Sequence, residues 1–113
     1  MIHLEKKQEQ ILKDNMPSLL VCNKLADFYS LFSDSTRIKI LITLILNEMC
    51  VNDLSKLLDI NQTTISHQLK ILKASGLINC YRKNKFMFYS IKEEYIKNTM
   101  LTGLDFLIKS KAS

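Results

Sequence analysis

The sequence predicts a mainly α-helical fold with one small β-hairpin. Apolar residues recur at helical spacing in about five to six separate segments. Two runs rich in β-forming residues follow one another late in the chain, with a short charged connection between them. The chain has 113 residues but only two glycines and one proline. It is therefore long enough for a single core and poor in flexible linkers.

The segment Gln62–Ala74 is predicted to be a helix with two unlike sides. At about 100° per residue, Ile65, Leu69 and Leu72 share one apolar stripe. The opposite side is polar and carries Gln62, Thr63, Ser66, His67, Lys70 and Lys73. Hydroxyl and amide groups flanked by lysines can hydrogen-bond base edges and neutralise phosphates. This side therefore indicates a nucleic-acid partner, and the alternative is an ordinary solvated face.

A second short helix, Asp53–Leu58, is predicted just before it, with Asn52 as its N-cap. Asn61 is the expected N-cap of the following helix, and Gly76 stands where a left-handed residue usually ends one. About three residues separate the two helices, and their apolar stripes must share a core. This arrangement indicates a helix-turn-helix.

After Gly76, Leu77–Arg82 and Phe86–Ile91 are predicted to pair as a hairpin through a three-residue loop, Lys83–Lys85. Asn84 can take a positive φ at the apex. The tip collects the cations Arg82, Lys83 and Lys85. Beside a helix-turn-helix, such a hairpin is expected to be a wing that touches the DNA backbone or minor groove. A charged tip that serves only solubility is the alternative.

The rest of the chain is predicted to complete one domain over residues 16–113, preceded by an N-terminal arm or short helix at 1–15. Asp34 is the expected cap of a helix over Ser35–Leu46, which Asn47 closes. Its nearly continuous apolar run also fits a buried strand. The cap and the length favour a central helix.

Two further helices, at 17–32 and 92–109, frame this domain. Pro17 suits the start of the first. The second places Ile96, Met100 and Leu104 on one stripe, with more apolar residues beside it. A domain this small does not cover so much apolar surface by itself. We therefore expect these helices to pack against a second copy, and the alternative is that one chain covers both faces.

The formal net charge of +5 and the pI of about 9.2 favour a polyanionic partner, either nucleic acid or an acidic membrane surface. The longest apolar run, Ile40–Leu46, is far shorter than the ~20 residues that span a bilayer. No signal peptide is recognised at the N-terminus, so a cytoplasmic protein without a membrane partner is expected. The sequence does not predict an enzyme, because it lacks a glycine-rich phosphate loop and paired carboxylates, and neither histidine has an evident nucleophile partner.

Several linked motifs resemble those of the ArsR/SmtB family of bacterial winged-helix repressors. They are Glu48–Leu54, Ile65–Leu72, Tyr81–Lys85 followed by Phe88–Ile91, and upstream Leu25–Tyr29 and Ser33–Leu41. The likeness runs almost without gaps from about Leu25 onward. It implies a winged helix-turn-helix fold, a homodimer formed through the first and last helices, and a repressor function. One departure is Ser35, where the family usually has proline after the capping aspartate.

Two recognition helices of such a dimer would enter successive major grooves about one turn apart (~34 Å), reading an inverted repeat in double-stranded DNA. Gln68 flanks the polar side and is a weaker candidate for base reading than Ser66 and His67. The candidate DNA contacts are Gln62, Thr63, Thr64, Ser66, His67, Gln68, Lys70, Lys73, Arg82, Lys83 and Lys85.

The resemblance also implies sites at which members of the family bind metal and release DNA. Cys50 and Asp53 match half of one such site, and Cys22 and His3 are the groups available to complete it. Zinc or another thiophilic ion would suit this set. Simple packing of Cys50 is the other interpretation. The family's second site, on the last helix, is not expected, because Glu93, Tyr95, Phe106 and Lys109 occupy its positions and only one of the four can serve as a ligand.

Two alternatives to a metal-released repressor stay open. The three cysteines match no disulfide framework or zinc ribbon, so a redox or persulfide switch could replace the metal, or the regulator could respond to no effector at all. Oxidation of Cys80 on the first wing strand would disturb the wing. In a different class of function, the domain would bind only other proteins. That reading predicts no salt-dependent DNA affinity.

Overall fold

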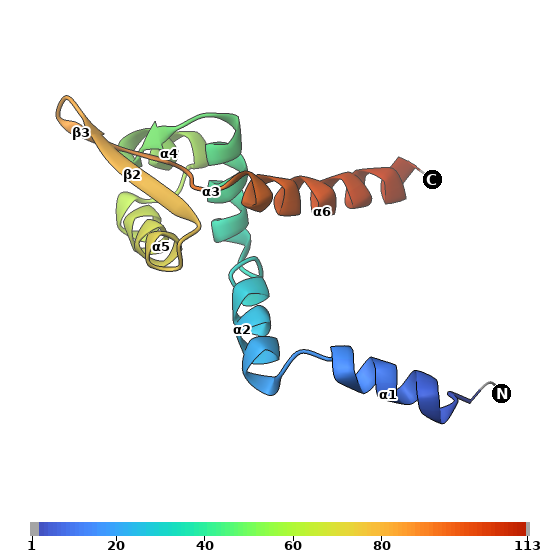
Figure 1. The fold of residues 1–113 in the computed structure, drawn as a ribbon. Coiled ribbons are helices and arrows are strands. Elements are labelled where there is room, and N and C mark those ends of the chain that lie inside the picture. The colour runs from blue at the N-terminus through green and yellow to red at the C-terminus, as the bar shows by residue number, and fades with distance from the viewer. Residues whose placement is uncertain (1–2, 113) are drawn as a thin grey trace. The chain divides into compact units, whose positions relative to one another are not determined.

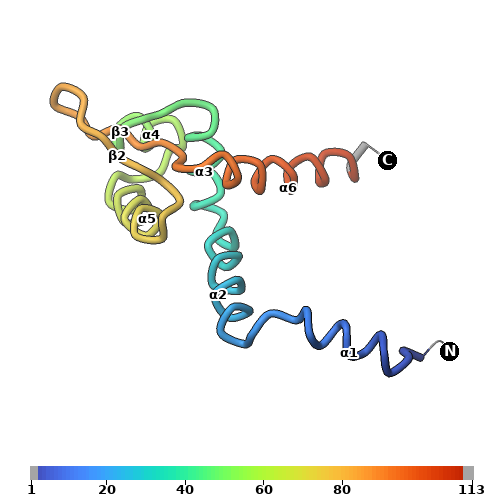
Figure 2. The backbone as a smooth tube through the Cα atoms, in the orientation of Figure 1, coloured from blue at the N-terminus to red at the C-terminus, as the bar shows by residue number. Residues whose placement is uncertain are grey.

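A computed structural model describes residues 3–112, with side chains described for residues 3–110. Figures 1 and 2 show its elements in chain order. They are α1 (Lys6–Asn15), α2 (Leu19–Ser30), α3 (Ser35–Leu46), β1 (Met49–Cys50), α4 (Val51–Leu58), α5 (Gln62–Ala74), β2 (Ile78–Lys83), β3 (Phe86–Ile91) and α6 (Glu94–Ala112). The predicted class, mainly helical with a small hairpin wing, is confirmed. The chain divides into two compact units, one ending at Leu31 and one beginning at Phe32.

The first unit contains α1 and α2, and local hydrogen bonds define their ends. The Ser18 Oγ caps α2 by accepting the Val21 N–H at 3.2 Å. Pro17 therefore precedes the cap, and the prediction that it starts the helix is wrong. Neither helix contains a buried residue. Apolar side chains such as Leu19, 77% exposed, lie on the surface of this chain.

The core of the second unit lies among α3, α4, α5 and the sheet. α3 begins where predicted, because the Asp34 Oδ2 accepts the Arg37 N–H at 3.2 Å. It ends at Leu46, with Asn47 as its C-cap. The interpretation of this run as a helix is confirmed. Thr43 is buried on it, and its hydroxyl donates to the Lys39 carbonyl at 2.8 Å. The buried apolar residues are Ile40, Leu41, Leu44, Cys50, Leu54, Ile65, Leu69, Leu72, Leu77, Ile78, Ile96 and Met100.

The sheet has three antiparallel strands in the order β1-β3-β2. The sequence predicts the hairpin of β2 and β3 but not β1, which is two residues long. Lys83 pairs with Phe86, so the loop contains two residues, Asn84 and Lys85, and the prediction of three is wrong. Asn84 has a φ of 58°, as expected for the apex.

The predicted cap of α4 is also wrong. α4 begins at Val51, one residue before Asn52, and Cys50 occupies the N-cap position without a side-chain hydrogen bond. The cause is not local: Cys50 is opposite Phe88 in the β1·β3 pair, so the chain stays extended up to that residue. Asn52 instead accepts a hydrogen bond from the Gln62 Nε2 at 3.0 Å. This bond joins α4 to the first turn of α5.

The first turns of α6 belong to the core, since Ile96 is fully buried and Met100 is 8% exposed. From Leu101 to Ser110 every residue is exposed. α6 is also longer at its C-terminal end than the predicted span of 92–109. Within the described part of the chain, none of the helices has the length and apolar character needed to traverse a membrane.

Candidate nucleic-acid interface

Helix α5 is capped at both ends, as its sequence predicts. The Asn61 Oδ1 accepts the Thr64 N–H at 2.8 Å and caps the N-terminus. At the other end Gly76 has a φ of 79°. The Leu77 and Gly76 N–H groups bond back to the carbonyls of Leu72 and Lys73, both at 3.0 Å, which is the Schellman pattern. α5 therefore has a defined length and direction.

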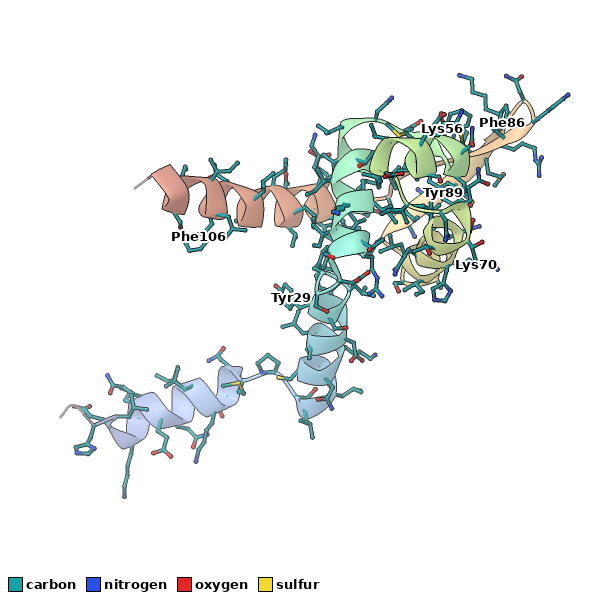
Figure 3. The ribbon with its side chains drawn as sticks, turned by 180° about the vertical axis from the view of Figure 1, so that it is seen from behind. Tyr29, Lys56, Lys70, Phe86, Tyr89 and Phe106 are labelled. Carbon is teal, nitrogen blue, oxygen red and sulfur yellow. The ribbon has the colours of Figure 1, made fainter. Side chains whose placement is uncertain are left out.

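The two predicted sides of α5 are both present. Ile65 and Leu72 are fully buried, and Leu69 is 1% exposed. On the other side, one open groove along the helix surface is lined by Gln62, Thr63, Ser66, His67 and Lys70. Figure 3 shows Lys70 on this outer side of α5. Because the apolar stripe fixes the helix against the core, these polar groups form a stable, outward-facing row, which we call the polar row.

The other predicted contacts on α5 lie off this row. Thr64 is exposed in the first turn. Gln68 is half-buried, and its Oε1 accepts a hydrogen bond from the Arg37 Nε at 2.9 Å. Lys73 is exposed, and its interaction with the Cys80 side chain is the main cause that raises its pKa. α5 itself packs against β2 of the wing.

The wing presents its cations outward. Arg82, Lys83 and Lys85 are all exposed near the hairpin tip. Beside them lies Phe86, 54% exposed and visible at the tip in Figure 3. The sequence pattern predicts only that Phe86 lies in a strand. Its exposure follows from its place at the first position of β3, beside the hairpin tip, which a β-propensity pattern does not locate.

A contact between Tyr81 and Glu48 holds the base of the wing. The Tyr81 hydroxyl donates to the Glu48 carboxylate, and this bond raises the pKa of Tyr81, with smaller contributions from burial and from the charge of Glu48. The Tyr81 ring stacks on Phe88, with centroids 5.8 Å apart and planes at 18°. Sequence reasoning missed this pair, because 33 residues separate its members.

The candidate metal ligands are distributed over both units. Cys50 is buried, and Asp53 is exposed in the first turn of α4. Cys22, on α2, and His3, ahead of α1, are exposed. Among the residues the structure describes, no group of three or more His, Cys, Asp or Glu side chains is placed to hold a metal ion.

The chain is similar in sequence to a group of related bacterial regulators. A family model described as bacterial regulatory protein, arsR family, matches residues 34–79, which run from the cap of α3 into β2. The chain is 27% identical over 110 residues to the transcriptional repressor SmtB homolog of Synechocystis sp., covering 97% of this chain and 82% of that protein. It is 34% identical over 83 residues to the cadmium resistance transcriptional regulatory protein CadC of Listeria innocua, covering 73% of this chain and 70% of that one.

The fold also matches solved structures. The crystal structure of the AntR antimony-specific transcriptional repressor superimposes with a TM-score of 0.77 over 100% of both chains, at 17% sequence identity. This likeness shows a shared winged-helix fold. The match to the arsR family model and the 34% identity to CadC, aligned over more than two thirds of CadC, agree with this fold. The chain therefore belongs to the ArsR family of bacterial regulatory proteins, a family of DNA-binding transcriptional repressors.

Proposed function

We propose that this protein represses transcription as a homodimer that places α5 of each copy in the major groove of an inverted-repeat operator. The observation that carries the proposal is the polar row, in which Gln62, Thr63, Ser66, His67 and Lys70 line one open groove above a fully packed apolar stripe. An α-helix fits the major groove, and hydroxyl, amide and imidazole groups can hydrogen-bond base edges there. We therefore refer to α5 as the recognition helix.

Positive charge beside the polar row supports DNA as the partner. Lys70 and Lys73 lie on the recognition helix, and the wing adds exposed cations at its tip. Contacts of this kind bind phosphates and fix the register of a protein on the duplex without reading sequence. Base reading is therefore assigned to Ser66 and His67, and backbone binding to the lysines and Arg82.

Uncovered apolar surface supports a dimer. α1 and α2 contain no buried residue, and α6 beyond Met100 is exposed throughout its described side chains. The exposed large apolar residues of these helices are Ile11, Leu12, Leu19, Leu20, Val21, Leu25, Tyr29, Tyr95, Leu101, Leu104, Phe106, Leu107 and Ile108. A monomer rarely leaves so many exposed. A two-fold symmetric partner would cover this surface and present the recognition helices as a pair.

Selection of duplexes from a random-sequence pool, followed by anisotropy titrations, tests the proposal. The wild-type protein should enrich an inverted repeat. Ser66→Ala and His67→Ala should each cost ~1–3 kcal/mol of binding and relax the base preference. Thr102→Ala, an exposed polar change on α6, should have no such effect. If a Ser66→Ala/His67→Ala double variant binds the operator as tightly as the wild type, α5 is not the recognition helix. If the wild-type protein enriches no duplex and shows no salt-dependent DNA affinity, a protein-binding module is favoured instead.

The proposal includes an effector that releases the DNA, either a thiophilic metal ion or a thiol-reactive compound. Relatives named for cadmium resistance and for antimony support a thiophilic ion. In this chain Cys50 directly precedes α4, and Asp53 lies in its first turn. A thiolate and a carboxylate suit such ions. Because α4 packs on the recognition helix, a metal ion bound at the first turn of α4 would change the orientation of α5.

Titration of the protein–DNA complex with zinc, cadmium, nickel and arsenite tests the effector. Release by one of these ions, lost in Cys50→Ser and Asp53→Ala, is the expected result. Cys22→Ala and His3→Ala report whether those residues complete the site. If no ion releases the DNA but a persulfide or disulfide reagent does, the thiol-reactive effector is correct, with Cys80→Ser as the variant that then identifies the thiol.

A further inference from the structure

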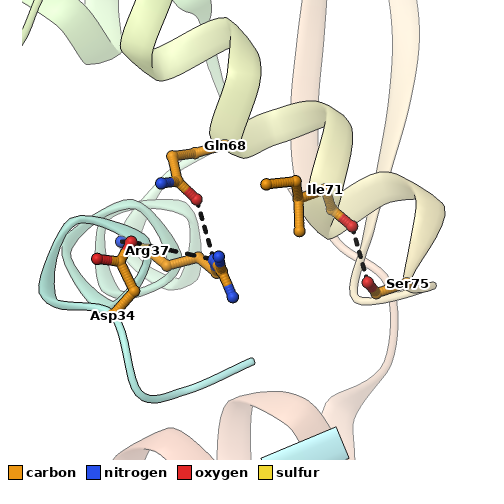
Figure 4. A network of polar contacts seen from close by, with 5 residues as sticks. All are labelled: Asp34, Arg37, Gln68, Ile71 and Ser75. Carbon is orange, nitrogen blue, oxygen red and sulfur yellow. Dashed lines mark hydrogen bonds and ion pairs between the residues drawn. The ribbon is translucent and has the colours of Figure 1, made fainter. Parts of the chain in front are cut away.

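A hydrogen bond joins α3 to the recognition helix. The Arg37 Nε donates to the Gln68 Oε1 at 2.9 Å, between residues 31 positions apart in the sequence. Figure 4 shows the two side chains meeting between the helices. The Arg37 side chain is 18% exposed, and Gln68 is half-buried. The contact therefore belongs to the packing of α3 against α5 rather than to the open groove.

Asp34 holds the guanidinium of Arg37 in place. Its Oδ2 accepts the Arg37 backbone N–H at 3.2 Å and lies 4.0 Å from the Arg37 Nε. The same carboxylate caps α3, so Arg37 extends from a fixed helical turn. A hydrogen bond with a charged donor is also stronger than one between neutral groups. Gln68 thus meets a donor that is already oriented.

This bond changes what Gln68 offers to DNA. A glutamine that pairs bidentately with adenine uses both ends of its amide, the oxygen as acceptor and the nitrogen as donor. Here the oxygen already accepts from Arg37. The neighbouring Ser66 and His67 line the open groove, and Gln68 does not.

We propose that Arg37 and Gln68 are positioning residues that fix the rotation of the recognition helix about its own axis, and that Gln68 does not read bases. Successive helical residues are about 100° apart. Holding Gln68 toward α3 therefore fixes the directions in which Ser66 and His67 point. The inference rests on the proposed DNA-binding function. It adds one cross-helix bond to the apolar packing that aligns the base readers.

The test uses the duplex that the wild-type protein enriches from a random pool, together with its single-base-pair variants. Arg37→Ala and Gln68→Ala should each weaken binding roughly three- to tenfold, and the double variant no further, because both remove the same bond. Both variants should lower the base preference at all the positions that Ser66 and His67 read. Additive effects, or loss of preference at one A·T pair in Gln68→Ala alone, would overturn the proposal.

Gln68→Glu separates positioning from base reading. Glutamate keeps the acceptor for Arg37 but lacks the amide donor that adenine N7 requires. It should restore most of the affinity and base preference lost in Gln68→Ala. If it instead behaves like Gln68→Ala while its thermal unfolding matches the wild type, Gln68 reads the DNA directly.

Lys39→Ala is the matched control for loss of a cation from α3, since Lys39 is exposed on the same helix. It should leave base preference unchanged. Thermal unfolding of each variant without DNA identifies any that fails to fold, and Arg37→Lys provides a second, milder change at that position. If the wild-type protein enriches no duplex, the proposed DNA-binding function is rejected. If it enriches one but Arg37→Ala and Gln68→Ala have additive effects on binding, only the positioning role is rejected.

Discussion

Asn61 shows how one side chain defines the start of the recognition helix. Its Oδ1 accepts the Thr64 N–H at 2.8 Å, which pairs one of the backbone donors that the first turn leaves free. Asn61→Ala should therefore destabilise the folded protein by about 1 kcal/mol. Chemical denaturation with the wild type and the exposed-site control Thr102→Ala measures this difference. An unchanged midpoint would show that the cap does not contribute.

Tyr81 gives the wing a pH-sensitive contact. The hydrogen bond to Glu48 requires the neutral phenol and raises the pKa of Tyr81 above its ordinary value of 10.0. A raised folded-state pKa means that the stabilisation is fully present below the unfolded-state pKa. It is lost as the pH rises through the folded-state value.

Tyr81→Phe should accordingly lower the unfolding midpoint at neutral pH, and the difference from the wild type should vanish at strongly alkaline pH. Ultraviolet titration of phenol ionisation in the native state gives a second check, because Tyr81→Phe should remove a component that titrates above the ordinary value. A midpoint difference that stays constant across the alkaline range would contradict the contact.

At the scale of elements, the wing supplies charge and the recognition helix supplies base contacts. Each phosphate contact releases counterions, so it contributes about 0.9 to the slope of log affinity against log salt. Lys83→Ala and Lys85→Ala should each weaken binding on every duplex. Because a homodimer loses the contact in both copies, each should reduce that slope by about two. Anisotropy titrations at several salt concentrations measure it, with Lys6→Ala on α1 as the control. A change in base preference instead would assign sequence reading to the wing.

The elements differ in how far the sequence predicts them. Caps such as Asp34 and Asn61, and the two sides of α5, depend on residues within one or two turns, so the sequence predicts them. The start of α4 was missed because it depends on pairing of Cys50 with Phe88, 38 residues on. Within the site, the polar row follows from periodicity. The Arg37–Gln68 bond does not, because no local pattern indicates which long side chains meet across a core.

At the scale of the whole molecule, the apolar faces of α1, α2 and α6 are the feature that one chain leaves uncovered. Leu107 is 60% exposed on α6, so a charge there costs the isolated chain little. In a dimer formed through this helix, the same charge would be buried without a partner. Leu107→Asp should therefore convert the dimer to monomers in sedimentation velocity and weaken operator binding, while Asn98→Asp on the polar side of α6 should do neither. A Leu107→Asp protein that stays dimeric would place the interface elsewhere.

Dimerisation and groove reading together make the central claim, and methylation-protection footprinting on the enriched duplex tests both. Guanine N7 methylation reports the major groove. We expect two protected segments on one face of the duplex, with centres about one helical turn (~34 Å) apart, and loss of both in the Ser66→Ala/His67→Ala variant. A single protected segment, or protection that survives this double substitution, would contradict it.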